Sequence, residues 1–312
     1  MNIKNFVRKH PSLYRFLMNL VERCNSVRWK IASRSSGGRE RLIAREYKKN
    51  TGETLRFPPI SYTEKIQFAK IYDSTPFKGE LSDKYLVRQW VANKIGEKYL
   101  IPLLGVWDKY GEIDFDELPE QFVLKTNQSS GTNVIVLDKS TMDHNFLRKE
   151  FNFWIKQNWA FAGKGFEMHY QYIHPRIIAE KYVTDSNGEL NDYKFLCFNG
   201  VPYYVWVDEG RLKDHRRNVY DMEWRLQEWR QYTYKNTDQP IPKPEHFNEM
   251  VELVKVLCEG FDHVRVDLYY VDGRIYFGEM TFTNGKGYEL IIPPESNDML
   301  GKLWTQNIKS IN

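Results

Sequence analysis

Apolar and polar residues alternate along residues 263–287, with one interruption. Alternation with a period of two is the pattern of a β-strand that has one buried face. The interruption is Asp272-Gly273, a dipeptide that closes two-residue hairpin turns. The stretch therefore predicts an antiparallel hairpin in which Tyr269 lies opposite Tyr276.

The predicted hairpin brings two carboxylates close together. Residues i and i+2 of a strand point to the same face, so Arg265 and Asp267 share a face. Pairing across the turn places Asp267 near Gly278 and Glu279. Two neighbouring carboxylates repel each other unless a cation lies between them, and Mg²⁺ binds one or two carboxylates together with substrate phosphates. The sequence leaves two interpretations: a magnesium site, or solvated edge residues joined to Arg265 by a salt bridge.

The rest of the chain mixes helical and strand-like patterns. Helices are predicted over residues 61–73, 82–95, 143–159 and 245–259. The second of these begins at Ser82-Asp83, a plausible helix cap. Strands are predicted over residues 121–124, 133–137, 176–183, 192–199 and 202–208, and loops over residues 33–38 and 57–59. This order indicates an α+β protein, because strands and helices do not alternate regularly.

Length and composition indicate an ordered protein of two or three lobes. The chain has 312 residues, of which 15% are aromatic and 28% are charged. No apolar run approaches the length of a membrane-spanning helix, and Arg15 interrupts the apolar stretch that a signal peptide would need. Cys24, Cys197 and Cys258 are spaced too widely for a disulfide framework or a zinc site. We therefore expect a cytoplasmic protein with reduced cysteines.

Positive charge is concentrated at the N-terminus, although the formal net charge of the chain is only +4. Residues 1–50 contain thirteen Lys and Arg against three Asp and Glu. Apolar residues recur among them at near-helical spacing: Phe6, Leu13, Tyr14, Leu17, Met18 and Val21. The pattern predicts a basic helical arm over residues 1–60. Its residues 1–35 either contact an anionic surface, such as the inner face of a membrane, or pack on the acidic body. Nucleic acid is not an expected partner, because no recognition motif is present.

A second informative stretch is QFVLKTNQSSGTNVIVL. A predicted strand ends near Lys125, and a loop of small and hydroxyl residues follows: Ser129, Ser130, Gly131 and Thr132. Backbone N–H groups of such a loop can lie over phosphate oxygens while the lysine supplies charge. The loop is not a P-loop, since the GxxxxGK[ST] order is absent. It is either a phosphate-binding loop or an ordinary hairpin turn.

Taken in order, several motifs resemble those of the ATP-grasp superfamily, from about Ser82 to Pro293. They are SDKYLVRQW, FVLK with SSGT, IIAEKYV, RVD, and GEM before a Gly-rich tail. DYKFLCFNG, VDEGR, YDMEW and GEMTFTNGKG are most similar to the teichuronopeptide-biosynthesis (TupA-like) branch, which is found with surface-polysaccharide genes. The resemblance implies an α+β fold whose two lobes grip ATP. The central lobe would span residues 61–180 and hold the phosphate loop, and the C-terminal lobe would span residues 181–312 and hold the metal site.

The resemblance also implies which residues bind the nucleotide. Lys84 and Lys125 would contact the ATP phosphates from two sides, beneath the loop of Ser129, Ser130, Gly131 and Thr132. The backbone of the hinge, at Glu180, Lys181 and Val183, would hold the adenine. Asp192 would bind the ribose hydroxyls and Lys194 would approach the γ-phosphate.

For the chemistry, the resemblance assigns Arg265 to the transferring phosphoryl group, and Asp267 and Glu279 to Mg²⁺. Family members often carry Glu-x-Asn, whose asparagine also binds metal. Here Thr281 stands at that place, so Asn284 is the candidate that compensates.

A basic cluster at Arg211, His215, Arg216 and Arg217 is a candidate site for an acidic substrate. The alternative is a loop held by salt bridges to Asp208 and Asp214. Three further aromatic residues would either stack on a sugar ring or pack the core: Trp224, Trp229 and Tyr232.

The resemblance implies an ATP- and Mg²⁺-dependent ligase that activates a carboxylate as an acyl phosphate and joins it to an amine. The branch implies that the acid is a uronic acid of a capsular or surface polysaccharide, or its activated precursor, and that the amine is a small molecule. One alternative is a sugar kinase of the same fold. Another is a glycosyltransferase or polymer-binding protein, which would leave Lys84, Lys125, Asp267 and Glu279 unexplained.

Overall fold

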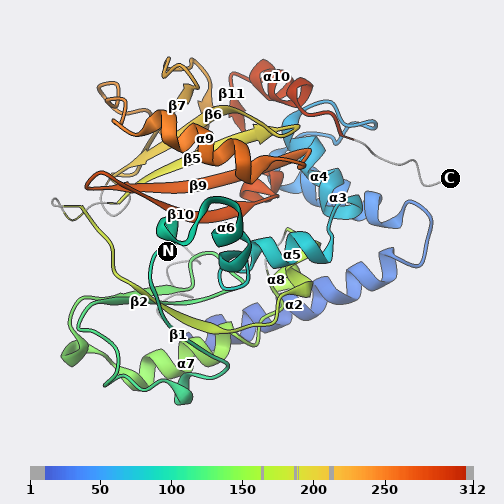
Figure 1. Cartoon of the computed structure of the whole chain (residues 1–312). Helices are drawn as coiled ribbons and strands as arrows, with labels where there is room; N and C mark the ends of the chain where they lie inside the picture. Colours follow the sequence, from blue (N-terminus) through green and yellow to red (C-terminus); the bar gives the residue numbers. More distant parts are fainter. Residues whose placement is uncertain (1–10, 163–164, 186–187, 189, 211–213, 307–312) are drawn as a thin grey trace.

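The computed structural model describes residues 11–162, 165–185, 188, 190–210 and 214–306. They form two lobes, each built on an antiparallel sheet (Figure 1). A cleft lined by residues of both sheets lies between them. The sheet of the lower lobe has the strand order β1-β4-β2-β3, and that of the upper lobe has the order β10-β9-β5-β6-β7. The α+β class predicted from the sequence is confirmed. No helix in the described part of the chain is long and apolar enough to cross a membrane.

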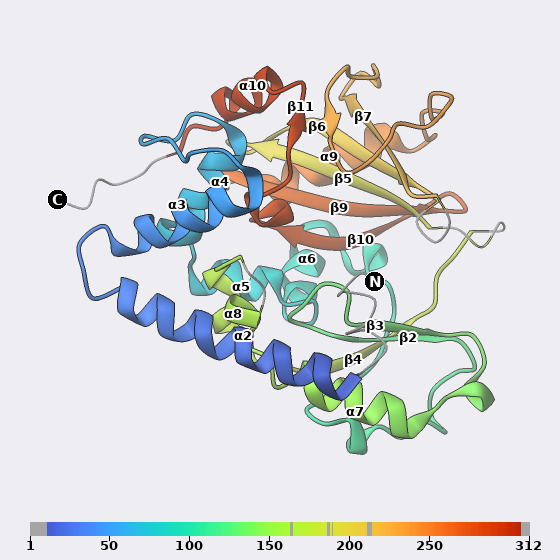
Figure 2. The ribbon, with the colours of Figure 1, turned by 180° about the vertical axis from the view of Figure 1, so that it is seen from behind.

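The lower sheet consists of β1 (Leu103–Trp107), β2 (Phe122–Thr126), β3 (Asn133–Val136) and β4 (Ile177–Lys181). Helix α7 (His144–Trp154) packs on one face of this sheet, and Phe151 lies in the same apolar core as Phe122 and Leu124. The short loop between β2 and β3 points toward the upper lobe (Figure 2).

The upper sheet consists of β5 (Asn191–Phe198), β6 (Val201–Glu209), β7 (Arg216–Asp221), β9 (His263–Val271) and β10 (Arg274–Thr281). Alternate residues such as Tyr193, Phe195 and Cys197 face α6 (Val87–Ile95) and α9 (Phe247–Cys258). This apolar side is the main core of the molecule.

The opposite face of the upper sheet is divided into an apolar half and a polar half. Leu196, Phe198 and Trp206 form the apolar half, which α4 (Tyr62–Tyr72) and α10 (Glu295–Leu303) cover. The polar half faces the cleft. Shorter elements complete the structure: α5 (Pro76–Ser82), α8 (Trp159–Ala162), β8 (Arg230–Gln231), β11 (Ile291–Ile292), and the 3₁₀ helices η1 (Glu97–Tyr99), η2 (Tyr110–Glu112), η3 (Lys139–Thr141), η4 (Met168–Tyr172) and η5 (Asn284–Gly287).

The N-terminal segment is a helical hairpin of α2 (Pro11–Ala32) and α3 (Gly38–Thr51). The break that the sequence predicts at residues 33–38 separates the two helices, and the loop predicted at residues 57–59 precedes α4. Capping explains where α4 begins, because Ser61 and Glu64 form a reciprocal capping box.

Two helix boundaries differ from those that the sequence predicts. The predicted helix over residues 82–95 begins only at Val87, because Ser82 is the last residue of α5. Asp83 instead caps a turn, and its Oδ1 accepts hydrogen bonds from the backbone of Tyr85 and Leu86. The helix predicted over residues 143–159 ends at Trp154. Strands β1 and β7 were not predicted.

A buried histidine couples the stability of the upper lobe to pH. His263 lies among Phe198 and Trp304, and its Nδ1 donates to the carbonyl oxygen of Cys197 at 2.8 Å. Burial lowers the pKa of His263 to about 3, against the opposing effect of this hydrogen bond. In the unfolded chain the imidazole takes up a proton near pH 6.5, whereas the native state does not. Between these values the unfolded state binds more protons, so the free energy of unfolding falls as the pH falls.

We expect His263→Gln to weaken this pH dependence. Between about pH 6.5 and pH 5, the wild type should lose roughly 1.5 kcal/mol more unfolding free energy than the variant. Urea unfolding of both proteins at the two pH values measures the difference. Equal losses would show that His263 does not carry this linkage.

Candidate functional site

The β9–β10 hairpin is the element that the sequence predicts most directly. Its turn is Asp272-Gly273, with φ of 46° and 78°, and Tyr269 pairs with Tyr276 as expected. The pairing then shifts by one residue between Phe277 and Glu279, because Gly278 is the extra residue of a β-bulge.

The bulge decides which way Glu279 points. With a regular register Glu279 would lie opposite Val266, which is in the core, whereas beyond the bulge it pairs with Asp267. A Cβ atom at Gly278 would lie only 3.0 Å from the carbonyl oxygen of Asp267, so glycine allows this close approach. The predicted meeting of the two carboxylates is thus confirmed.

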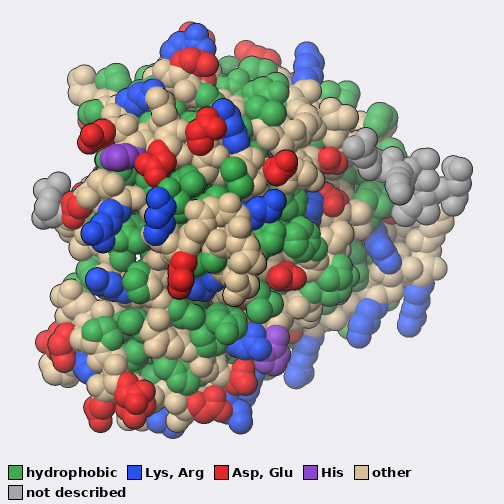
Figure 3. All heavy atoms as spheres, in the orientation of Figure 1, with side chains coloured by type: hydrophobic (Ala, Val, Ile, Leu, Met, Phe, Trp, Pro, Cys, Tyr) green, Lys and Arg blue, Asp and Glu red, His purple; other side chains and the backbone are tan. Residues whose placement is uncertain are grey.

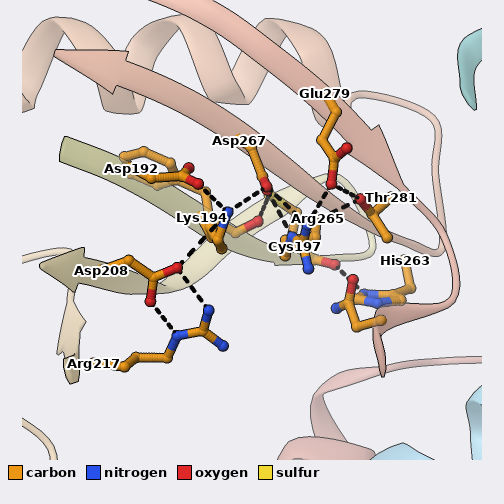
Figure 4. Close-up of polar contacts among 12 residues, drawn as sticks. Asp192, Lys194, Cys197, Asp208, Arg217, His263, Arg265, Asp267, Glu279 and Thr281 are labelled. Atoms are coloured by element: carbon orange, nitrogen blue, oxygen red, sulfur yellow. Dashed lines mark hydrogen bonds and ion pairs between the residues drawn. The ribbon is translucent and has the colours of Figure 1, made fainter. Parts of the chain in front are cut away.

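Arg265 lies between the two carboxylates (Figure 4). Its Nε donates to Asp267 Oδ1 at 2.6 Å, and its Nη2 donates to Asp267 Oδ2 at 2.7 Å and to Glu279 Oε1 at 2.6 Å. Thr281 Oγ1 donates to the same Glu279 oxygen at 2.9 Å. We call Arg265, Asp267, Glu279 and Thr281 the hairpin clamp. The salt bridge to Arg265 is therefore present, although Asp267 is buried rather than solvated, and the magnesium site stays a prediction.

The two carboxylates differ in what they can offer a metal ion. Asp267 is 1% exposed, and burial raises its pKa against the opposing charges of Arg265 and Lys194. The side chain of Glu279 is 35% exposed and lines the cleft. Burial would raise the pKa of Glu279, but Arg265, Lys84 and Lys194 outweigh it and hold this pKa at about 2. Glu279 is therefore ionised at neutral pH.

The carboxylates of Glu279 and Asp267 are suited to a Mg²⁺ ion that also binds a phosphate ligand. Among the residues that the structure describes, no group of three or more His, Cys, Asp or Glu could form a cage for a metal ion. Mg²⁺ does not need such a cage, since one or two carboxylates plus substrate phosphates suffice. Glu279 supplies an accessible carboxylate and Asp267 lies beside it. Asn284, the third predicted ligand, instead donates to the hydroxyl of Tyr62.

A buried charge network extends the hairpin clamp across the upper sheet. Lys194 Nζ lies 2.9 Å from Asp267 Oδ2 and 3.9 Å from Asp208 Oδ2, and it also donates to Asp192. Burial would lower the pKa of Lys194, but Asp192 and Asp267 raise it, so the ammonium group stays charged. Asp192 itself is 1% exposed, a placement that gives no support to a ribose contact; its neighbour Asn191 lines the cleft.

Arg217 extends the network from Asp208 to Gln231, and its pair with Asp208 is the salt bridge predicted as the alternative role of the basic cluster. Arg217 is 5% exposed and binds Asp208 through two hydrogen bonds of 2.5 and 2.7 Å. His215 Nε2 lies 3.1 Å from the same carboxylate. Arg216 points the other way along β7, as alternation requires, and pairs with Asp214 at 2.7 Å.

The predicted substrate cluster is therefore divided by the structure. His215 lies at the site, Arg216 does not, and Arg211 lies outside the described residues. Of the aromatic candidates, Trp224 stacks on the buried Tyr220 at 4.4 Å and Trp229 is 4% exposed. Both pack the core, whereas Tyr232 is 65% exposed.

Two lysines lie at the cleft: Lys125 on β2, and Lys84 in the turn between α5 and α6. Lys84 Nζ donates to the carbonyl oxygen of Ser129 at 2.6 Å, and Lys125 Nζ lies 2.5 Å from Glu180 Oε2. Burial lowers the pKa of Lys84, and the carboxylate of Glu279 opposes that effect. The charges of Lys84 and Glu279 therefore shift each other's pKa, although the two residues are far apart in the sequence.

Hydroxyl groups fix the loop between β2 and β3. Thr126 Oγ1 lies 2.7 Å from Ser129 Oγ and 2.6 Å from Thr132 Oγ1, and these two hydroxyls also bond to each other. Ser130 and Gly131, at the tip, are exposed. The loop is therefore held at its base while its backbone N–H groups at the tip remain open to a ligand.

Two further polar residues, Asp83 and Asn127, hold Lys84 beside this loop; Asp83 was predicted only as a helix cap, and Asn127 was not predicted. Asn127 Nδ2 donates to Asp83 Oδ2 at 2.8 Å and to the carbonyl oxygen of His174 at 2.9 Å. The backbone carbonyl of Asn127 also accepts from the N–H of Lys84 at 3.1 Å. These bonds join the turn that carries Lys84 to the end of β2.

Residues from both lobes line a cleft of about 440 Å³ between the two sheets. Its walls come from the lower lobe, from β9 and β10, and from the hinge that links β4 to β5: Lys84, Lys125, Ser129, Ser130, Gly131, Thr132, Glu180, Lys181, Val183, Asn191, Tyr269 and Glu279. A volume of this order accommodates a small-molecule cofactor. The predicted hinge residues Glu180, Lys181 and Val183 thus lie where a ligand in the cleft would meet them.

A comparison with protein families shows to which family a chain with this cleft belongs. The model of the TupA-like ATP-grasp family matches residues 64–305. The chain belongs to the TupA-like ATP-grasp family. The resemblance inferred from the motifs is confirmed, and the match covers both lobes of this ATP-grasp protein. A search among curated proteins found no match.

Solved structures similar to this ATP-grasp protein include two ligases and a synthase. D-alanine–D-alanine ligase from Bacillus anthracis is 20% identical, with a TM-score of 0.43, over 72% of this chain and 63% of that one. The same enzyme from Helicobacter pylori is 12% identical, with a TM-score of 0.36, over 72% and 61%. N5-carboxyaminoimidazole synthase from Aspergillus clavatus, in complex with ADP and 5-aminoimidazole ribonucleotide, is 11% identical, with a TM-score of 0.38, over 66% and 46%. The matched part is less than two thirds of each of these structures.

Proposed function

We propose that this ATP-grasp protein is an ATP-dependent ligase that joins a carboxylate to an amine through an acyl phosphate. The observation that carries the proposal is that Lys84, Lys125 and Glu279 of the hairpin clamp line one cleft of about 440 Å³, with Arg265 behind Glu279. Two lysines and an accessible carboxylate that could share Mg²⁺ suit a triphosphate, which carries several negative charges close together.

In the proposed complex the triphosphate lies under the loop of residues 129–132. Lys125 and Lys84 flank this loop, and each is held in place by a bond described above, to Glu180 and Ser129 respectively. The adenine lies at the hinge, beside the backbone of Lys181 and Val183. These positions follow from the cleft lining together with the ATP-grasp resemblance.

Glu279, with Asp267 beside it, would hold Mg²⁺, which when bound neutralises phosphate charge and orients the γ-phosphate. Arg265 and Lys194 supply fixed positive charge behind these carboxylates. Both stay protonated, because buried carboxylates surround them.

The reaction requires a carboxylate to attack a polyanion. A carboxylate oxygen forms a bond to the γ-phosphorus while the bond to the β–γ bridging oxygen breaks, which releases ADP. An amine then attacks the acyl carbon and expels orthophosphate, and the amide forms with loss of one proton. The positive charges of Lys84, Lys194 and Arg265 offset the repulsion in the first step, and no enzyme nucleophile is required.

For substrates, we propose a uronic acid of a capsular or surface polysaccharide, or its activated precursor, and a small amine. The resemblance of DYKFLCFNG and GEMTFTNGKG to the teichuronopeptide-biosynthesis branch supports this class. Such a reaction draws on cytoplasmic ATP, so we place the protein in the cytoplasm. His215 is the residue of the predicted basic cluster that lies near the charge network.

Hydroxylamine tests the proposal without knowledge of the amine. With ATP, Mg²⁺ and a uronic acid, the ligase should form a hydroxamate, because hydroxylamine captures an acyl phosphate but not a phosphate ester. Hydroxamate should appear in step with ADP and orthophosphate, and only when the acid is present. A stable phosphorylated sugar without orthophosphate would instead show a kinase.

A further inference from the structure

Helix α2 is fixed to the body of the protein by one face. Asn25 is buried and donates to the carbonyl oxygen of Phe161 at 2.9 Å, and Arg28 pairs with Glu46 at 2.5 Å. One turn from the start of the helix, Arg15 pairs with Glu150 of α7. These contacts, made near both ends of α2 and at its middle, set the orientation of the helix about its own axis.

The opposite face of α2 carries an exposed apolar stripe. Its members are Leu13, Phe16, Leu20, Val27 and Ile31, whose exposed fractions are 40%, 64%, 48%, 54% and 60%. Steps of three, four and seven residues separate them, so they lie in one row along the helix. Of the apolar residues that predict the arm, Leu13 belongs to this stripe and Tyr14 and Leu17 are also exposed, whereas Met18 and Val21 are half-buried against the body. Phe6 lies outside the described residues.

Positive charge surrounds the stripe. The exposed Lys and Arg of α2, of α3 and of the loop that joins them are Arg23, Lys30, Arg34, Arg39, Arg41, Arg45, Lys48 and Lys49. The acidic residues of the same segment are not exposed: Glu46 is buried and paired, Glu40 accepts from Tyr72, and Glu22 is half-buried. Figure 3 shows Lys and Arg side chains projecting along the edge of the molecule where α2 runs.

We propose that the outer face of α2 docks on an anionic phospholipid bilayer, with the helix parallel to the surface. The stripe would enter the boundary between headgroups and acyl chains while Arg23 and Lys30, at its edge, pair with lipid phosphates. A second copy of the chain is a poorer occupant, because the exposed charged side chains around the stripe are all positive, and two such surfaces repel each other. The surface is separate from the cleft, so the proposal does not depend on the proposed reaction.

Flotation of the purified full-length chain with lipid vesicles tests this docking. The protein should float with vesicles that contain phosphatidylglycerol and stay in solution with vesicles of phosphatidylcholine alone, and added salt should release it. Phe16→Ser combined with Ile31→Ser should lower the bound fraction by about tenfold or more, since burial of these side chains drives insertion. Arg23→Glu combined with Lys30→Glu should do the same.

The matched control is Val201→Ser combined with Leu226→Ser, which changes exposed apolar residues of the upper lobe and should leave flotation unchanged. ATP hydrolysis should be equal in all these variants, because none of the changed residues lines the cleft. Three results would overturn the proposal: equal flotation with both vesicle types, flotation unaffected by either pair of α2 changes, or a wild-type dimer that these changes dissociate while vesicle binding is absent.

Discussion

Changing Glu279 to glutamine should lower the rate of ATP-dependent ligation by roughly 10²–10³-fold, while the protein remains folded. Glu279 is the accessible carboxylate of the hairpin clamp, and its pKa of about 2 means that it carries a full negative charge at neutral pH. Glutamine has the same shape and can still accept a hydrogen bond from Arg265. The substitution therefore removes the charge that would hold Mg²⁺ with little disturbance of packing.

The hairpin also offers a matched control. Asp272→Asn makes the same change of carboxylate to amide at the turn, where the left-handed φ of 46° suits asparagine. Thermal melts of both variants should stay close to that of the wild type, and only Glu279→Gln should lose turnover. Raised Mg²⁺ should restore part of the lost rate. Near-normal turnover of Glu279→Gln at ordinary Mg²⁺ would refute the metal assignment, as would an equal loss in Asp272→Asn.

Local sequence was sufficient to predict the hairpin and the pairing of its carboxylates. The turn dipeptide and the period of two are short-range signals, and they fix the register near the turn. The bulge at Gly278 shifts this register by one residue, and a single glycine in a strand is not enough to predict such a shift. The prediction that Asp267 lies near Glu279 held because the bulge brings these two residues directly opposite each other.

The rest of the polar face depends on contacts between distant strands. Lys194 meets Asp267 because β5 pairs with β9, and Asp208 meets Arg217 because β6 pairs with β7. Strand β7 reads RRNVYD, whose charged start looks like a loop in isolation. Arg217 is buried only because a carboxylate on the neighbouring strand neutralises it. Periodicity alone cannot reveal such a pair.

The predicted start of a helix at Ser82-Asp83 was wrong for a different reason. Ser82-Asp83 has the composition of a cap, and Asp83 does accept backbone hydrogen bonds. Its other oxygen, however, accepts from Asn127, far away in sequence, so the chain turns there and α6 starts later. Lys84 and Lys125 were predicted as nucleotide ligands by motif resemblance alone, and both line the cleft.

The fate of the carboxylate oxygen tests the central claim, that the protein activates a carboxylate by phosphorylation. A uronic acid labelled with ¹⁸O in its carboxylate is incubated with ATP, Mg²⁺ and hydroxylamine, and the released orthophosphate is analysed by mass spectrometry. An acyl phosphate keeps the carboxylate oxygen that attacked the γ-phosphorus, so cleavage at the acyl carbon should leave one ¹⁸O atom in each orthophosphate formed. The same label should be absent when Glu279→Gln replaces the wild type and no product forms. Unlabelled orthophosphate produced in step with ADP, or a label retained entirely in a phosphorylated sugar, would contradict the account.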